Sequence, residues 1–309
     1  ITDDTRHKLV LLHALHAVER ADRWPMDVRN LAQAYLDWPE TAAVTGRSGY
    51  PELARDWLEE WQFAARWVLG SRDLERARPP ERMWQSLPTC CGQMTSLPLA
   101  AIFAGQPDEA YRAAYHLGFF DNGFGKDLNA ALVAGLAAAL ATPPGATPRT
   151  AFARVLASMR ETDPFQFKKI RWTERAVDRW LNLALKFARE ASGEPARLFA
   201  SLEKEFAQTT KWEAQVPFVV AFSCFEIADY DPLAALQLSM EWGHDTDSYA
   251  QLAGALAGAL HGPELFQEAW RDAVAGRLRA DHGTVLEEEC AFLERLRVRA
   301  EKQSMVKPL

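Results

Sequence analysis

The stretch that decides the fold is GHDTDSYAQLAGALAGAL, residues 243–260. Its second half contains only small and apolar residues, with Gly254 and Gly258 four positions apart, so another helix could approach this face closely. Each helical glycine costs roughly 1 kcal/mol relative to alanine, and close packing would compensate for that cost. We therefore expect a central helix that begins near Asp245 and Asp247 and holds these carboxylates rigidly.

A second acidic cluster stands at the start of the chain, where residues 2–5 read TDDT. Like Asp245, Asp247 and Ser248, it combines two carboxylates with a hydroxyl group ahead of a helical pattern. Such groups often only cap a helix, because they accept hydrogen bonds from its free N–H groups. They are also the oxygen ligands that Mg²⁺ prefers. If folding brings the two clusters together, they form a site for two cations, which indicates hydrolysis.

Helical patterns follow one another along the whole chain. Leu9, Leu12 and Leu15 recur at helical spacing, and no segment shows convincing alternation of apolar and polar residues. We predict an all-α protein with one domain over residues 1–309, because this length lies near the upper limit for one hydrophobic core. The proline-rich stretch 142–148 is interpreted as a break between helices. The expected helices cover residues 8–20, 27–37, 51–69, 95–105, 107–119, 127–141, 149–160, 173–191, 195–207, 216–227, 231–242, 248–261, 263–276 and 284–301, with a loop at 76–88.

Composition narrows the possible partners. The net charge of −7 and the pI of about 5.6 argue against a broad nucleic-acid surface. No apolar run reaches the about 20 residues that a membrane-spanning helix needs, and no signal peptide is visible. We expect a cytoplasmic protein without nucleic-acid or membrane partners, whose oligomeric state the sequence leaves open. Its cysteines match no zinc spacing, so we expect reduced thiols, with a redox role for Cys90 or Cys91, or a disulfide, as the alternatives.

Other prominent side chains favour structural roles. His7, His13 and His16 lie along one predicted helix without an acidic triad beside them, so we expect exposed or capping histidines there. Two further groups are assigned to core packing and to a solvated helix face: Trp57, Trp61 and Trp67, and Glu287, Glu288 and Glu289.

The two acidic motifs and the small-residue helix carry a resemblance to a known family. Residues 243–260 resemble the signature Gly-Gly-Asp-Thr-Asp-Thr-x-Ala-x-x-Ala-Gly-Ala of the ADP-ribosylglycohydrolases, of the dinitrogenase reductase-activating type, and TDDT is similar to that family's other acidic motif. Met94 and Pro98 resemble its Met-Arg-x-x-Pro-Leu stretch. The resemblance is strongest at residues 1–15, 89–141 and 216–270.

The resemblance implies a compact orthogonal multi-helix fold with a binuclear Mg²⁺ or Mn²⁺ centre at the bottom of a cleft. It implies hydrolysis of the glycosidic bond between ADP-ribose, or a related nucleotide sugar, and a protein side chain or small acceptor. The alternative is a non-catalytic relative that binds a nucleotide or has a structural role. The resemblance implies Asp4 and Asp245 as catalytic carboxylates. The metal ligands it implies are Thr2, Asp3, Asp4, Asp245, Asp247 and Ser248, with Ser248 in place of the usual threonine.

Substrate contacts are expected from residues 92–94 and 121–123, in the middle of the chain, and from His244, which departs from the family signature. His244 stands where the family has its second glycine, and we favour a structural or metal-orienting role over a direct one. Thr95 stands where the family often has arginine. A preceding helix with a Gly-Asp-x-x-Gly pattern is expected in the family, and this sequence begins after it. The candidate substrate-binding residues are Gly92, Gln93, Met94, Asp121, Asn122, Gly123 and His244, although residues 121–125 equally fit a plain turn between helices.

Overall fold

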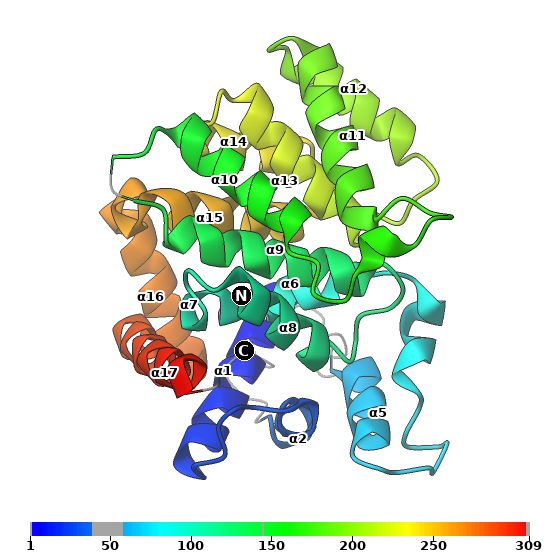
Figure 1. The fold of residues 1–309 in the computed structure, drawn as a ribbon, viewed down its shortest axis with the longest axis vertical. Helices are drawn as coiled ribbons and strands as arrows, with labels where there is room; N and C mark the ends of the chain where they lie inside the picture. The colour runs from blue at the N-terminus through cyan, green and yellow to red at the C-terminus, as the bar shows by residue number, and fades with distance from the viewer. Residues whose placement is uncertain (1, 39–57, 144, 307–309) are drawn as a thin grey trace.

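The chain folds into helices packed around one core (Figure 1). The computed structural model describes residues 2–38, 58–143 and 145–306. Within these residues there is no β-strand, only one isolated bridge between Thr89 and Glu213. The predicted all-α class is confirmed. None of the described helices is both long and apolar enough to cross a lipid bilayer.

Two apolar helices form the centre of the molecule. Helix α9 (Gly125–Leu140) is rich in alanine and leucine, and nearly all of its residues are buried. Helix α13 (Gln215–Ile227) is buried from Gln215 to Phe225, and α11 (Ala176–Ala191) packs between these two elements. Helices that are apolar on all sides belong in a core, which explains why other helices surround α9 in Figure 1. The predicted break at 142–148 joins α9 to α10 (Pro148–Glu161), which packs directly against it.

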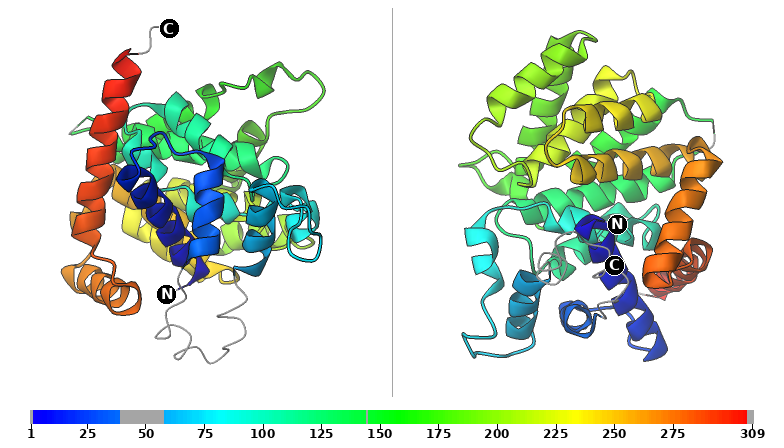
Figure 2. Two further views of the ribbon diagram at one scale, coloured as in Figure 1. Left: turned by 90° about the horizontal axis from the view of Figure 1, so that it is seen from below. Right: turned by 180° about the vertical axis from the view of Figure 1, so that it is seen from behind.

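Three helices from distant parts of the sequence meet beside α9 and carry the candidate site. They are α1 (Asp3–Arg20), α6 (Cys91–Thr95) and α15 (Thr246–His261), and each contacts the other two. Figure 2 shows α1 and the start of the chain from behind and from below. The remaining elements are α2 (Val28–Asp37), α5 (Glu59–Val68), η1 (Pro80–Ser86), α7 (Leu99–Ile102), α8 (Pro107–Leu117), η2 (Phe167–Lys169), α12 (Pro195–Glu205), α14 (Pro232–Glu241), η3 (Pro263–Leu265), α16 (Glu268–His282) and α17 (Leu286–Val306).

The expected role of the glycines in α15 is wrong. A Cβ atom built on Gly254 would lie 3.9 Å from Leu236, and one on Gly258 would lie 3.7 Å from Phe266, which are ordinary contacts. The close approach occurs instead in α9, where a Cβ on Gly135 would lie 2.6 Å from Met159 of α10. Alanine-rich α9 is therefore the central helix, and α15 packs beside it.

Some helix boundaries also differ from the sequence-based expectation. The predicted helix 95–105 is two short helices, α6 and α7, separated by a turn that contains Pro98. The segment 76–88 contains the short η1. The predicted helix 263–276 is replaced by η3 and the later α16. The predicted helix 51–69 begins outside the described residues, as does Trp57, and its described part is α5.

The sequence suggested that the histidines of α1 are exposed or cap the helix, and this expectation is wrong for His7. His7 is fully buried, its ring lies 4.3 Å from that of Trp61, and its Nδ1 lies 3.0 Å from the Tyr35 hydroxyl group. Burial lowers the pKa of His7 to about 3, so its ring is neutral. His16 is half-buried, stacks on Phe292 and lies 2.9 Å from Glu289. These two histidines anchor α1 to its neighbours.

Candidate active site

Folding brings the two acidic clusters together. Asp3 and Asp4 form the first turn of α1, and Asp247 lies in the first turn of α15. One carboxylate oxygen from each of these three residues lies within 4.8 Å of the other two, which makes them a group able to hold a metal ion. Two helix N-termini also direct positive partial charge toward the cluster. The predicted association of segments about 240 residues apart is thus present in the structure.

Helix capping does not explain these side chains. Thr2 and Asp245 occupy the N-cap positions of α1 and α15, yet neither side chain accepts a capping hydrogen bond. Asp4 Oδ1 and Asp245 Oδ2 are buried and have no hydrogen-bond partner among the described residues. A buried carboxylate oxygen without a partner is costly. Coordination of a divalent cation would satisfy both oxygens, so these residues fit a metal ion.

The cluster is electrostatically strained as it stands. Burial, together with the negative charges of Asp247 and Asp3, raises the pKa of Asp4 to about 7, against the opposing charge of Lys8. Burial and the neighbouring Asp247 likewise raise the pKa of Asp245 to about 7, and burial raises the pKa of Asp3. Like charges in a poorly solvated site disfavour ionisation, and a bound cation would reverse this effect.

Lys8 links the helices that form the cluster. Its ammonium group donates a hydrogen bond of 3.0 Å to the Asp4 carbonyl oxygen and another to Gln251 Oε1 on α15. Gln251 in turn donates through Nε2 to the Gln93 carbonyl oxygen on α6, at 3.2 Å. Burial lowers the pKa of Lys8 to about 8, although the charge of Asp4 opposes this. α1, α15 and α6 are therefore tied together directly behind the carboxylates.

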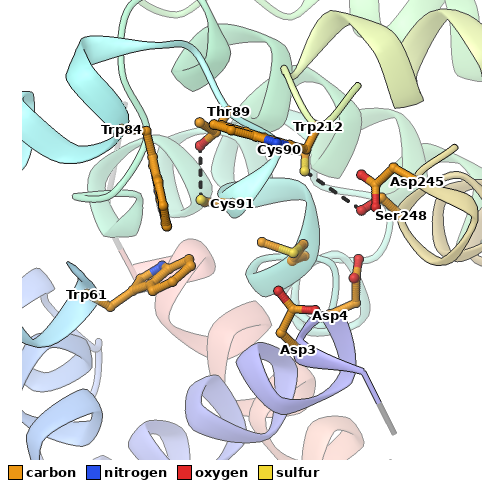
Figure 3. A pocket seen from close by; sticks show the side chains of 11 residues that line it. Asp3, Asp4, Trp61, Trp84, Thr89, Cys90, Cys91, Trp212, Asp245 and Ser248 are labelled. Atoms are coloured by element: carbon orange, nitrogen blue, oxygen red, sulfur yellow. Dashed lines mark hydrogen bonds between the residues drawn. The ribbon is translucent and has the colours of Figure 1, made fainter. Parts of the chain in front are cut away.

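A pocket of about 280 Å³ opens beside the cluster (Figure 3). Its two sides differ in chemistry. One side carries the oxygen atoms of Asp3, Asp4, Asp245 and Ser248, whereas the other is apolar. The remaining lining residues are Trp61, Trp84, Thr89, Cys90, Cys91, Met94 and Trp212.

Sequence reasoning missed most of the apolar side. Trp61 was assigned to packing, and it is 4 % exposed, yet its ring also borders the pocket. Trp84 and Trp212 were not singled out, because they lie in η1 and in the connection before α13, and no local pattern marks them. Tryptophans in short polar connections were the available signal, since a large aromatic side chain placed there needs a partner surface.

Cys90 and Cys91 are buried free thiols at the start of α6. Cys90 Sγ lies 3.8 Å from Ser248 Oγ, and Cys91 Sγ accepts a hydrogen bond of 2.9 Å from Thr89 Oγ1. Burial raises the pKa of both thiols, so neither is an activated nucleophile. Cys224 and Cys290 are free as well; Cys224 is buried like Cys90 and Cys91, whereas Cys290 is exposed.

Several predicted substrate-binding residues lie behind the pocket rather than along it. Asp121 Oδ1 accepts a hydrogen bond of 2.8 Å from the Gly92 N–H, and its Oδ2 accepts one of 3.1 Å from Asn129. Asn122 donates to the Met83 carbonyl oxygen, and Gln93 donates to the Ala214 carbonyl oxygen. Among the candidates for substrate contact, Met94 borders the pocket, whereas Gly92, Gln93, Asp121, Asn122, Gly123 and His244 are not among its lining residues.

Asp121 fixes the start of α6, and this contact makes a testable prediction. A Cβ atom on Gly92 would lie 2.1 Å from Asp121 Oδ2 and 2.3 Å from Asn129 Nδ2, which is far too close. We expect Gly92→Ala to lower the free energy of unfolding by about 3 kcal/mol, as measured by urea denaturation. Gly276→Ala is the matched control, because nothing lies within 4 Å of its Cβ position. That helical substitution should instead stabilise the protein by up to about 1 kcal/mol. Equal effects of the two variants would contradict the packing.

His244 is turned away from the pocket. Its Nε2 lies 2.5 Å from Glu203 Oε1, and its ring contacts Trp242 at 4.8 Å. Its φ of +59° explains why glycine suits this position, since few side chains adopt the left-handed region. We expect His244→Ala to change the affinity for Mn²⁺ by less than about twofold, because the ring contacts none of the cluster carboxylates. Isothermal titration calorimetry measures this, and a loss of tenfold or more would place His244 in the site.

Comparison with known proteins agrees with this geometry. A family model described as ADP-ribosylglycohydrolase matches residues 1–303. Neither a search of curated proteins nor a search of solved structures finds a significant match. The match spans both acidic motifs, α6 and the pocket between them. The chain therefore belongs to the ADP-ribosylglycohydrolase family, and its function is of the glycohydrolase type.

Proposed function

We propose that this protein is a divalent-cation-dependent hydrolase that cleaves the glycosidic bond between ADP-ribose, or a related nucleotide sugar, and its acceptor. The observation that carries the proposal is the pair of buried oxygens, Asp4 Oδ1 and Asp245 Oδ2, which have no partner among the described residues. They border one pocket with Asp3, from clusters at two ends of the chain. An isolated structural role would leave both oxygens desolvated without compensation.

The acidic residues of the two clusters would serve as cation ligands. Asp3, Asp4 and Asp247 would hold the cation, and Asp245, Ser248 and Thr2 complete the set of oxygen donors that the sequence motifs supply. Two Mg²⁺ or Mn²⁺ ions are proposed, and when bound they would lower the pKa of a water molecule and polarise ribose hydroxyl groups near the anomeric carbon. The apolar side of the pocket limits the access of other water molecules.

Asp245 is the best-placed proton acceptor on the acidic side. It borders the pocket, where a general base can reach the attacking water molecule, and its side chain interacts with Ser248. The bond that breaks joins the anomeric carbon of ribose to its acceptor, through a transition state of oxocarbenium character.

The proposal is tested by incubating the protein with Mn²⁺ and substrates that carry ADP-ribose on arginine, on serine or on a small acceptor. The expected result is release of free ADP-ribose that Asp245→Asn abolishes while the helical circular dichroism spectrum is retained. Mn²⁺ binding without release of ADP-ribose from any substrate would favour the non-catalytic alternative. Absence of Mn²⁺ binding to the intact chain would refute the proposal.

A further inference from the structure

The apolar side of the pocket is an aromatic wall, which we define as Trp61, Trp84 and Trp212. The ring centroids of Trp61 and Trp84 are 5.4 Å apart with an interplanar angle of 67°, and those of Trp84 and Trp212 are 5.7 Å apart with an angle of 64°. His7 supports Trp61 from behind, at 4.3 Å. The three rings come from separate parts of the chain, and mutual contact fixes them before any ligand arrives.

The aromatic wall faces the acidic side without any basic residue between them. Among the described residues that line the pocket there is no lysine or arginine. The polar lining groups are carboxylates and hydroxyl groups, such as those of Asp4 and Thr89. A phosphate group would therefore find no cationic side chain on the described lining of the pocket. A planar ring that stacks on Trp84 would instead meet Trp61 and Trp212 edge to face, because these two rings are inclined to Trp84 by 67° and 64°. The ligand group that fits the aromatic wall is flat and carries no negative charge.

The size of the pocket sets a second limit. Its volume of about 280 Å³ lies at the lower end of small-molecule pockets, which span roughly 300–1,000 Å³. There is room for one ring system and the sugar attached to it. Trp61 Nε1 is buried and has no hydrogen-bond partner among the described residues. A ring nitrogen or carbonyl oxygen of the ligand could accept a hydrogen bond from it.

We propose that the aromatic wall binds a small planar nitrogen heterocycle attached to the ribose, so that the acceptor released by the proposed hydrolysis is a heterocyclic ring held by an N-glycosidic bond rather than a protein side chain. This rests on the proposed function, in which the acidic side holds the ribose. The water oxygen joins the anomeric carbon, and the bond to the ring nitrogen breaks with its electron pair going to that nitrogen. Asp245 takes the proton of the water. That proton then passes to a neutral leaving ring, or to solvent if the leaving ring was cationic.

The test uses ring binding without metal or turnover. Saturation-transfer NMR in the presence of EDTA would compare nicotinamide and cytosine with cyclohexanecarboxamide, which keeps the amide but not the flat ring, and with methylguanidine, which mimics an arginine side chain. We expect millimolar binding of both heterocycles and at least tenfold weaker binding of the other two compounds. Equal binding of cyclohexanecarboxamide or methylguanidine would overturn the proposal.

Two tryptophan variants locate the binding. Trp84→Leu should weaken heterocycle binding about tenfold, as expected for the loss of one stacking partner. Trp270→Leu is the matched control, because this half-exposed tryptophan lies on α16, outside the pocket. Unchanged binding by folded Trp84→Leu would overturn the proposal, and Trp212→Leu replaces that variant if it does not fold. If the parent protein binds Mn²⁺ but neither heterocycle, this inference alone is rejected. If the parent protein binds the heterocycles but not Mn²⁺, the metal-dependent function is rejected.

Discussion

Asp4→Asn should both abolish tight metal binding and stabilise the metal-free protein. Asp4 is 4 % exposed, and its pKa rises from 3.8 to about 7 because it is buried beside Asp247 and Asp3. A shift of about three units corresponds to roughly 4 kcal/mol of destabilisation by the ionised form. Because the amide of asparagine must also be desolvated, we expect a net gain of about 2 kcal/mol at pH 8 in EDTA.

The same substitution removes a ligand. Loss of one buried carboxylate should lower the affinity for Mn²⁺ by roughly 100-fold or more, since even supporting residues of metal sites contribute 10- to 100-fold. Urea denaturation and calorimetry measure the two effects on one sample. Asp229→Asn is the control, because the side chain of Asp229 is 82 % exposed and paired with Arg149 far from the cluster. An Asp4→Asn protein that binds Mn²⁺ like the parent would remove Asp4 from the site.

The opposite signs of these two effects separate a functional site from a structural one. If Asp4 served only the folded structure, its replacement would destabilise the protein. Asp4 Oδ1 makes no hydrogen bond to any described residue, so replacing Asp4 removes the repulsion from Asp247 and Asp3 and loses the attraction to Lys8, but no hydrogen bond at Oδ1. The surrounding helices supply the compensating stability, because α9 and α13 bury apolar surface on all sides.

The sequence predicted the acidic half of the site and not the aromatic half, for a physical reason. Asp3 and Asp245 stand in short motifs at the start of helices, and such local motifs can be recognised in the sequence alone. Trp84 and Trp212 converge only through tertiary packing, and neither belongs to a periodic segment. Asp121 shows the converse, because its glycine-flanked loop suggested a ligand contact whereas its carboxylate instead holds α6.

The same limit applies to the fold. Periodicity located most helices, because apolar spacing is a local property. Periodicity could not show which of the helices rich in small residues has another helix packed closely against it. Gly254 and Gly258 looked suited to that role, yet Gly135 of α9 is the one pressed against Met159. Both helices are rich in alanine and glycine, and only the surrounding chain decides which of them lies at the centre.

Between about pH 4 and 7, the free energy of unfolding should fall with rising pH in the metal-free protein and rise with pH when Mn²⁺ is bound. In EDTA, Asp4, Asp245 and Asp121 each have a pKa near 7 in the folded protein, against an ordinary value of 3.8 in the unfolded chain. Between these values the folded state binds more protons than the unfolded state, so stability falls as pH rises from about 4 to 7. His7 opposes this between about 3 and 6.5, because burial keeps it neutral, but it is one group against three.

Lys8 extends the curve on the alkaline side. Its pKa is about 8 in the folded protein, against an ordinary value of 10.5 in the unfolded chain. Between these values the folded state binds fewer protons, so stability recovers as pH rises above 8. The metal-free protein should therefore be least stable between about pH 7 and 8. Thermal unfolding in EDTA from pH 5 to 10 measures this minimum, and Asp121→Asn should make it shallower without touching the metal ligands.

Bound cation should reverse the acid side of that curve, because it requires the carboxylates of Asp4 and Asp245 to be ionised. Metal affinity falls as these groups take up protons. At a Mn²⁺ concentration of 100 times the dissociation constant, binding stabilises by about 2.7 kcal/mol, which corresponds to a rise in melting temperature of about 5 °C at pH 8. Near pH 5 the rise should vanish. A Mn²⁺ effect of equal size at both pH values would mean that the ion binds elsewhere, since no carboxylate with a pKa near 7 would then take part. Asp4→Asn should show no rise at either pH, which ties the effect to the cluster.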